Sequence, residues 1–104
     1  MNLKTQEYIC TLAECGSITE AAKRLYISQP ALSMYISNVE KSMGIQLFDR
    51  SGKNLKLTYT GELYVHKARQ MIELQDEFER EVNDIRAGIT GRIRIGLQRK
   101  RSTT

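Results

Sequence analysis

Apolar residues recur at helical spacing along most of this chain, and capping residues divide that pattern into segments. Residues 2–15 carry one apolar stripe, and Gly16 follows it, as a glycine commonly follows the last turn of a helix. Ser17 and Glu20 have the spacing of a capping box, in which the Ser17 hydroxyl accepts from the Glu20 N–H and the Glu20 carboxylate bonds back to the Ser17 N–H. The pattern therefore predicts a first helix ending near residue 15 and a second over about residues 18–26.

A third helix is predicted over residues 28–43. Ser28 is a suitable N-cap, and Pro30 lies in the first turn, where its missing N–H removes no hydrogen bond. Gly44 then ends the helix. Its core-facing stripe recurs at steps of four, three and four residues and consists of Leu32, Ile36, Val39 and Met43.

The opposite face of this third helix carries small polar side chains and no acid before Glu40. Hydroxyl groups and an amide can lie against the edges of DNA bases without burying an unpaired charge, and glutamine can form two hydrogen bonds with adenine. The alternative is an ordinary solvated face, although such faces are usually rich in Lys and Glu. The candidate DNA-binding residues of this helix are Ser28, Gln29, Pro30, Ser33, Met34 and Ser37.

A short β-hairpin is predicted to follow. Leu55 and Leu57 alternate with Lys56 as in a half-buried strand, and residues 50–54 contain the Gly and Asn that a tight turn needs. Beside a DNA-reading helix, such a hairpin lies along the phosphates or enters the minor groove. Its candidate DNA contacts are Arg50, Lys53 and Asn54, of which Lys53 lies at the tip. For Arg50, the alternative is that its side chain holds the hairpin in place.

A long helix is predicted over residues 59–87, with Thr58 as its N-cap and with Gly88 and Gly91 beyond its end. Residues at heptad spacing form a largely apolar seam along it, which predicts pairing with a second copy of the chain. The predicted dimer interface consists of Tyr64, Ala68, Met71, Gln75, Phe78, Val82 and Ile85. For Tyr64 and Ala68, packing against the first helix of the same chain is an equally weighted alternative.

Two segments resemble the LysR-type transcriptional regulators of bacteria: GSITEAAKRLYISQPALS at residues 16–33 and LFDRSGKNLKLTYTGE at residues 47–62. Their order and spacing match that family, and the resemblance extends over nearly the whole chain. It implies a mainly α fold in which a winged helix-turn-helix domain, with three helices and a two-stranded β wing, occupies residues 1–58. Its helix-turn-helix lies at about 18–37, and a dimerising linker helix follows at 59–87.

The resemblance also implies partners and a continuation. A homodimer would bind double-stranded DNA at an imperfect palindrome, and the full-length protein could form higher oligomers. Residues 88–104 would be a hinge and the truncated, disordered start of a ligand-sensing domain. No cofactor is expected in this chain, because a small-molecule effector would bind that absent C-terminal domain.

Composition adds little to this picture. The 104 residues carry a formal net charge of +4, but residues 88–104 alone hold five Lys or Arg and no acid. The overall charge is therefore weak evidence for nucleic-acid binding, and the local basic surplus around the hairpin is better evidence.

The sequence shows no catalytic or metal-binding constellation. Cys10 and Cys15 are five residues apart, which turns them away from each other on a helix, and His66 stands alone. An enzyme is therefore disfavoured, and the remaining alternatives are another winged-helix regulator or a helical protein-interaction module. The N-terminus has no apolar export signal and no segment is apolar enough to span a membrane, so a cytoplasmic protein is expected.

Overall fold

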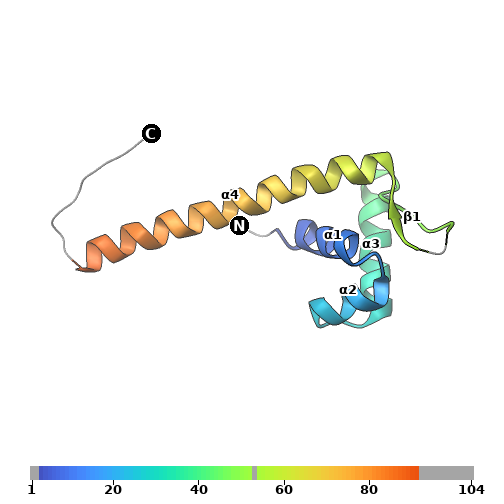
Figure 1. Ribbon diagram of the computed structural model, residues 1–104, viewed down its shortest axis with the longest axis horizontal. Helices are drawn as coiled ribbons and strands as arrows, with labels where there is room; N and C mark the ends of the chain where they lie inside the picture. The colour runs from blue at the N-terminus through green and yellow to red at the C-terminus, as the bar shows by residue number, and fades with distance from the viewer. Residues whose placement is uncertain (1–2, 53, 92–104) are drawn as a thin grey trace. The chain divides into compact units, whose positions relative to one another are not determined.

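The computed structural model describes residues 3–52 and 54–91 (Figure 1). Two compact units meet between Ile72 and Glu73, within the last helix, and each is described by itself. The order of elements is α1 (Lys4–Cys15), α2 (Ile18–Leu25), α3 (Gln29–Met43), β1 (Phe48–Asp49), β2 (Lys56–Leu57) and α4 (Tyr59–Gly91). This confirms the predicted fold class of three helices, a two-stranded wing and a long helix.

The ends of the first three helices lie where the capping residues predict. Gly16 and Gly44 follow α1 and α3 in the left-handed conformation, with φ of 64° and 69°. The Ser17 hydroxyl accepts from the Glu20 N–H at 3.3 Å, and the Ser28 hydroxyl accepts from the Ala31 N–H at 3.2 Å. The capping box is nevertheless incomplete, because the Glu20 carboxylate pairs with Lys23 at 3.7 Å and makes no bond to the Ser17 N–H.

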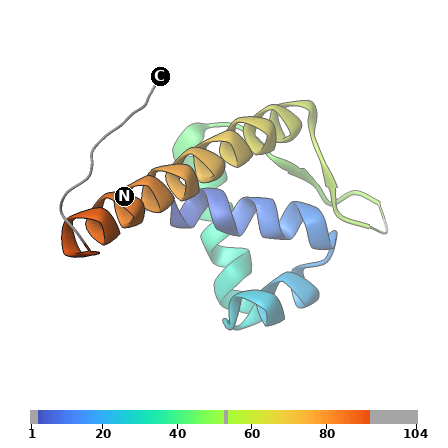
Figure 2. The same cartoon turned by 60° about the vertical axis from the view of Figure 1, so that its left-hand side comes forward.

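The core of the first unit lies between these helices and the start of α4. Figure 2 shows α1 between α2 and the first turns of α4. The small residues Ala21 and Ala22 are buried, which lets α2 approach its neighbours closely. The largest fully buried side chains are those of Ile9, Leu12, Leu32, Ile36, Leu47 and Phe48.

The wing is joined to α4 through Thr58. Phe48 pairs with Leu57 and Asp49 with Lys56 in the antiparallel ladder. The Thr58 hydroxyl donates to the Gln46 carbonyl at 2.6 Å and accepts from the Gly61 N–H at 2.9 Å, which confirms Thr58 as the N-cap of α4. The start of α4 is thereby fixed to the segment that leads from α3 into the wing.

Gly61 makes this junction possible because it has no Cβ. A Cβ at this position would collide with the Leu47 carbonyl oxygen and lie 3.0 Å from Leu57 Cδ2. We therefore expect Gly61→Ala to lower the free energy of unfolding by about 1 to 3 kcal/mol, the usual effect of overpacking. Urea unfolding would measure the loss, and Gly52→Ala is the control because nothing lies within 4 Å of its added Cβ. Equal stability of the two variants would contradict this packing.

The expected end of the long helix is wrong. α4 continues through Gly88 to Gly91, four residues beyond the predicted end at Ala87. A glycine inside a helix costs about 1 kcal/mol relative to alanine, and a glycine that ends a helix commonly adopts the left-handed conformation, whereas Gly88 has no positive φ. The predictions for residues 92–104 lie outside the described residues.

Candidate nucleic-acid interface

The first turns of α3 present a polar surface opposite a buried one. Leu32 and Ile36 are fully buried, which fixes the helix face that turns away from the core. Ser37, which was predicted on the same face, is half-buried. The other five predicted residues of α3 and its cap are all exposed, and they are Ser28, Gln29, Pro30, Ser33 and Met34.

The electrostatics of this surface suit an anion. The backbone N–H groups at the start of α3 carry the positive end of the helix dipole, and the helix has no acid in its first turn. The one acidic residue of α3 is Glu40, near its other end. The exposed N-terminal surface of α3 can therefore approach phosphates without electrostatic repulsion from its own helix.

Gln29 is held by a residue that the sequence did not identify. The Thr19 hydroxyl of α2 donates to Gln29 Oε1 at 3.1 Å, and both side chains are exposed. This bond joins the first turns of the two helices of the helix-turn-helix. Helical periodicity could not identify this pair, because Thr19 and Gln29 lie on different helices. The turn between α2 and α3 brings them together.

A second set of contacts fixes α3 against α1. The rings of Tyr8 and Tyr35 have centroids 4.8 Å apart, and the Tyr35 hydroxyl lies 2.7 Å from Thr5 Oγ1. Lys4 Nζ lies 5.4 Å from the Tyr8 ring centroid and 5.3 Å from that of Tyr35, within the range of a cation–π contact. Because Tyr35 follows Met34 directly, these contacts position the exposed face of α3.

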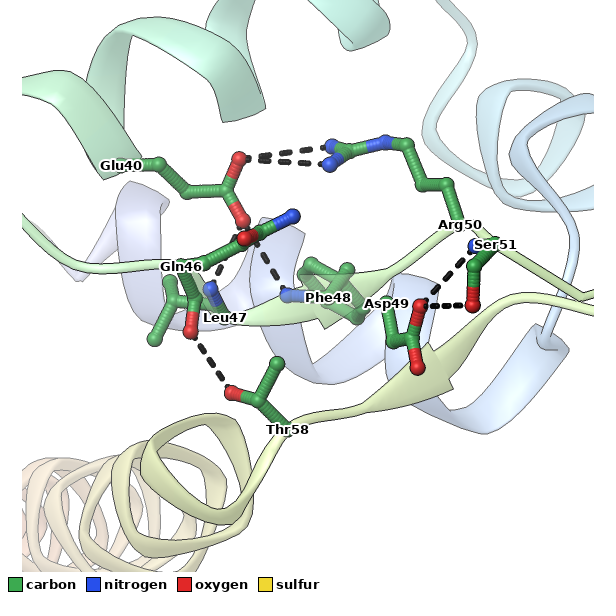
Figure 3. A network of polar contacts seen from close by, with 8 residues as sticks. All are labelled: Glu40, Gln46, Leu47, Phe48, Asp49, Arg50, Ser51 and Thr58. Atoms are coloured by element: carbon green, nitrogen blue, oxygen red, sulfur yellow. Dashed lines mark hydrogen bonds and ion pairs between the residues drawn. The ribbon is translucent and has the colours of Figure 1, made fainter.

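Arg50 contributes to the fold of the wing. Figure 3 shows the Glu40 carboxylate at the centre of a polar network that joins α3 to β1. It accepts from the Leu47 N–H at 2.7 Å and from the Phe48 N–H at 3.1 Å, and its other oxygen lies 3.4 Å from Arg50 Nη1. These contacts favour the alternative in which Arg50 holds the hairpin, although 42% of its side chain remains exposed.

The turn of the wing begins with a bonded carboxylate. Asp49 Oδ1 accepts from the Ser51 N–H at 2.9 Å and from the Ser51 hydroxyl at 2.7 Å (Figure 3). These two hydrogen bonds lower the pKa of Asp49, because they stabilise its charged form. Asn54 is exposed on the far side of the turn, and the predicted tip residue Lys53 lies outside the described residues.

The predicted dimer seam divides between two environments. Ala68 is only 1% exposed within the core of its own chain, which favours the intramolecular alternative for this residue. Tyr64 is half-buried against the same core, which favours the intramolecular alternative for it too, and this burial raises the pKa of its hydroxyl. Both residues belong to the first unit, in the part of α4 that contributes to its core.

Farther along α4, the seam is open to solvent. Met71, Phe78 and Ile85 are 44%, 59% and 61% exposed, while Gln75 and Val82 are half-buried. Leu74, which the heptad pattern omitted, is 64% exposed and lies one helical turn from Phe78. Its position four residues before Phe78 places it on the same face of the helix, and this spacing could have identified it from the sequence. We call Met71, Leu74, Phe78, Val82 and Ile85 the α4 stripe.

Other chemistry finds little support in the described part of the chain. No group of three or more His, Cys, Asp or Glu residues there could hold a metal ion. Cys10 is a buried free thiol whose pKa is raised mainly by desolvation, which makes it a core residue and a poor nucleophile. Within residues 3–52 and 54–91, no helix combines the length and apolarity needed to cross a membrane.

Comparison with known sequences matches this chain to one family and to relatives whose names agree with that family. Residues 3–62 match the family described as bacterial regulatory helix-turn-helix protein, lysR family. The uncharacterized HTH-type transcriptional regulator YcgK of Bacillus subtilis is 36% identical, over 93% of this chain and 30% of its own length. An uncharacterized HTH-type transcriptional regulator in the ibpB-leuC intergenic region of Azotobacter vinelandii is 31% identical, over 95% of this chain and 73% of its own length. The chain thus spans less than a third of YcgK and most of the second relative.

Solved structures with the same fold include complexes with DNA. A crystal structure of a BenM_DBD/catB site 1 DNA complex superposes with a TM-score of 0.80 at 33% identity and covers 85% of this chain and 95% of that one. A crystal structure of a CbnR_DBD–DNA complex gives a TM-score of 0.73 at 29% identity and covers 82% of this chain and 98% of that one.

Proposed function

Because the chain belongs to the lysR family of bacterial regulatory helix-turn-helix proteins, we propose that it binds double-stranded DNA sequence-specifically and regulates transcription. The observation that carries this proposal is the exposed, acid-free N-terminal surface of α3, held in place by a buried face of the same helix. The family consists of regulators, so the chain is not an enzyme. A regulator that acts on bacterial DNA works in the cytoplasm.

In this proposal, α3 enters the major groove with its N-terminal end first. Gln29 and Ser33 offer hydrogen-bonding groups to base edges, and Met34 offers an apolar surface that suits a thymine methyl group. Pro30 shapes the first turn and adds apolar contact without a donor. Ser28 and Ser37 flank this reading surface, and Ser28 already caps the helix through its bond to the Ala31 N–H.

The wing contributes affinity in the same proposal. The proposed contacts with phosphates or the minor groove come from Asn54 and from Lys53, which the sequence pattern predicts at the tip of the hairpin. Arg50 has less freedom to do so, because its guanidinium lies beside Glu40. We therefore assign Arg50 first to holding the wing and second to a phosphate contact.

We further propose that the α4 stripe pairs two copies of the chain, so that each copy binds one half of an imperfect palindrome. Burying an apolar side chain of this size contributes about 1.5 to 3 kcal/mol, and three members of the stripe are more than half exposed: Leu74, Phe78 and Ile85. The other exposed seam residue, Met71, is 44% exposed and lies three residues before Leu74 in the same helix. A second copy of α4 offers a matching surface.

The test is a titration of the 104-residue protein with DNA selected from a random pool, repeated at several salt concentrations. Proteins that make six to ten phosphate contacts lose roughly 10³- to 10⁵-fold in affinity between 50 and 200 mM salt. We expect a steep loss of this kind together with a preference for the selected sequence over random DNA. A helical protein-interaction module would show neither, and failure of the selection to enrich any sequence would contradict the proposal.

A further inference from the structure

The hydrogen bond between Thr19 and Gln29 crosses from the first turn of α2 to the first residue of α3. We propose that Thr19 is a positioning residue that orients the Gln29 amide for base recognition, and that it thereby sets which bases are accepted there. This inference rests on the proposed function, because it assumes that Gln29 faces DNA. It adds a residue of α2 to the determinants of sequence specificity.

Thr19 is placed rigidly enough for this role. The Ser17 hydroxyl caps the turn in which Thr19 lies, and the buried residues Ala21 and Ala22 fix α2 against the core. Threonine is branched at Cβ, so its χ1 angle has few accessible values. Gln29, in contrast, has three flexible side-chain torsions and is exposed. A rigid donor beside a flexible amide reduces the conformational freedom that binding would otherwise have to remove.

The bond seen in the structure leaves one of the two amide groups of Gln29 for an incoming base. Its Oε1 accepts from the Thr19 hydroxyl at 3.1 Å, while among the described residues no partner binds Nε2. The amide therefore presents its N–H donors to an incoming base. Purine N7, guanine O6 and thymine O4 are acceptors in the major groove, whereas cytosine presents the N4 donor. We infer that Gln29 favours adenine, guanine or thymine over cytosine, which offers its amide no acceptor at this edge.

Loss of the Thr19 hydroxyl should relax this selectivity. An unrestrained amide can rotate by half a turn and offer its oxygen to the cytosine N4 group. Thr19→Val keeps the size and branching of the side chain but removes the donor, and Thr19→Ser restores it. Because Thr19 is exposed, neither change should shift the Tm appreciably.

The experiment measures the dissociation constants of wild-type protein, Thr19→Val and Thr19→Ser on four versions of the selected site that differ at the base read by Gln29. We expect Thr19→Val to weaken binding of the preferred site three- to tenfold and to shrink the penalty for cytosine about tenfold, with random DNA unaffected. Thr19→Ser should retain the wild-type profile. A wild-type preference for cytosine, or an unchanged profile in Thr19→Val, would overturn the inference while leaving DNA binding intact.

A double-mutant cycle with Gln29→Ala isolates the coupling. If Thr19 acts through Gln29, Thr19→Val should have no further effect in the Gln29→Ala background. The same loss in both backgrounds would instead make Thr19 an independent phosphate contact and overturn the inference. The NMR order parameter of the Gln29 side-chain amide, measured in the free protein, gives a readout without DNA. It should fall in Thr19→Val and recover in Thr19→Ser.

Discussion

Replacing Glu40 with alanine is expected to lower the free energy of unfolding by about 2 to 6 kcal/mol, because it leaves two buried N–H groups unpaired at about 1 to 3 kcal/mol each. These donors belong to Leu47 and Phe48, which are 0% and 1% exposed and lie 2.7 and 3.1 Å from the carboxylate. The Glu40 side chain itself is only 11% exposed, so water replaces it poorly. The upper end of this range reaches the whole stability of a marginally stable domain, about 5 kcal/mol.

Two further variants separate the backbone hydrogen bonds from the ion pair. Glu40→Gln keeps one acceptor oxygen and should lose clearly less stability than Glu40→Ala. Arg50→Ala removes a pair at 3.4 Å whose cation is 42% exposed, and such pairs contribute about 0 to 1 kcal/mol. Urea unfolding followed by circular dichroism gives all three values. A loss in Arg50→Ala as large as that in Glu40→Ala would assign the effect to the ion pair instead.

The second large effect is expected from Phe78→Asp in the proposed α4 pairing. Phe78 is 59% exposed in the single chain and occupies the middle of the α4 stripe. A charge in a buried helix pair is strongly unfavourable, so this variant should be a monomer. Linking two binding sites raises affinity by about 10²- to 10⁴-fold, and a full palindrome should therefore bind the variant more weakly by this factor.

Asn83→Asp is the matched control for Phe78→Asp. It adds the same charge to the same helix outside the α4 stripe and can still accept the hydrogen bond that Arg86 donates to Asn83. Sedimentation should show that this control is still a dimer. Titration with full and half sites should show that its affinity for the full site is unchanged. If Phe78→Asp stays dimeric, or binds the full site as a monomer with unchanged affinity, the stripe is not the pairing surface.

Local signals in the sequence predicted most of the fold. Ser17, Ser28 and Thr58 each cap a helix as their positions suggested, since a cap depends only on residues two or three positions away. Gly16 and Gly44 end their helices for the same local reason. The exposure of the polar face of α3 was also predictable, because the stripe of Leu32 and Ile36 fixes which side is buried.

Contacts between distant segments were not predictable in the same way. Glu40 binds N–H groups seven and eight residues later, and Thr19 reaches Gln29 only because of the turn between α2 and α3. Ala68 lies on the predicted heptad seam but is buried in the core of its own chain, and periodicity alone cannot distinguish burial within one chain from burial between two chains. The sequence did offer one unused hint, since Glu40 is the lone acid in α3.

The N-terminal end of α3 is proposed to read bases, and Gln29→Ala tests this role most directly. The measurement is the dissociation constant of wild type and variant on the selected site and on random DNA, with Gln70→Ala on the exposed surface of α4 as the control. We predict that Gln29→Ala loses about 1 to 3 kcal/mol on the selected site, the value of one good base contact, and almost nothing on random DNA. Gln70→Ala should change neither constant. Equal losses of Gln29→Ala on both DNAs, or no loss on the selected site, would contradict the account.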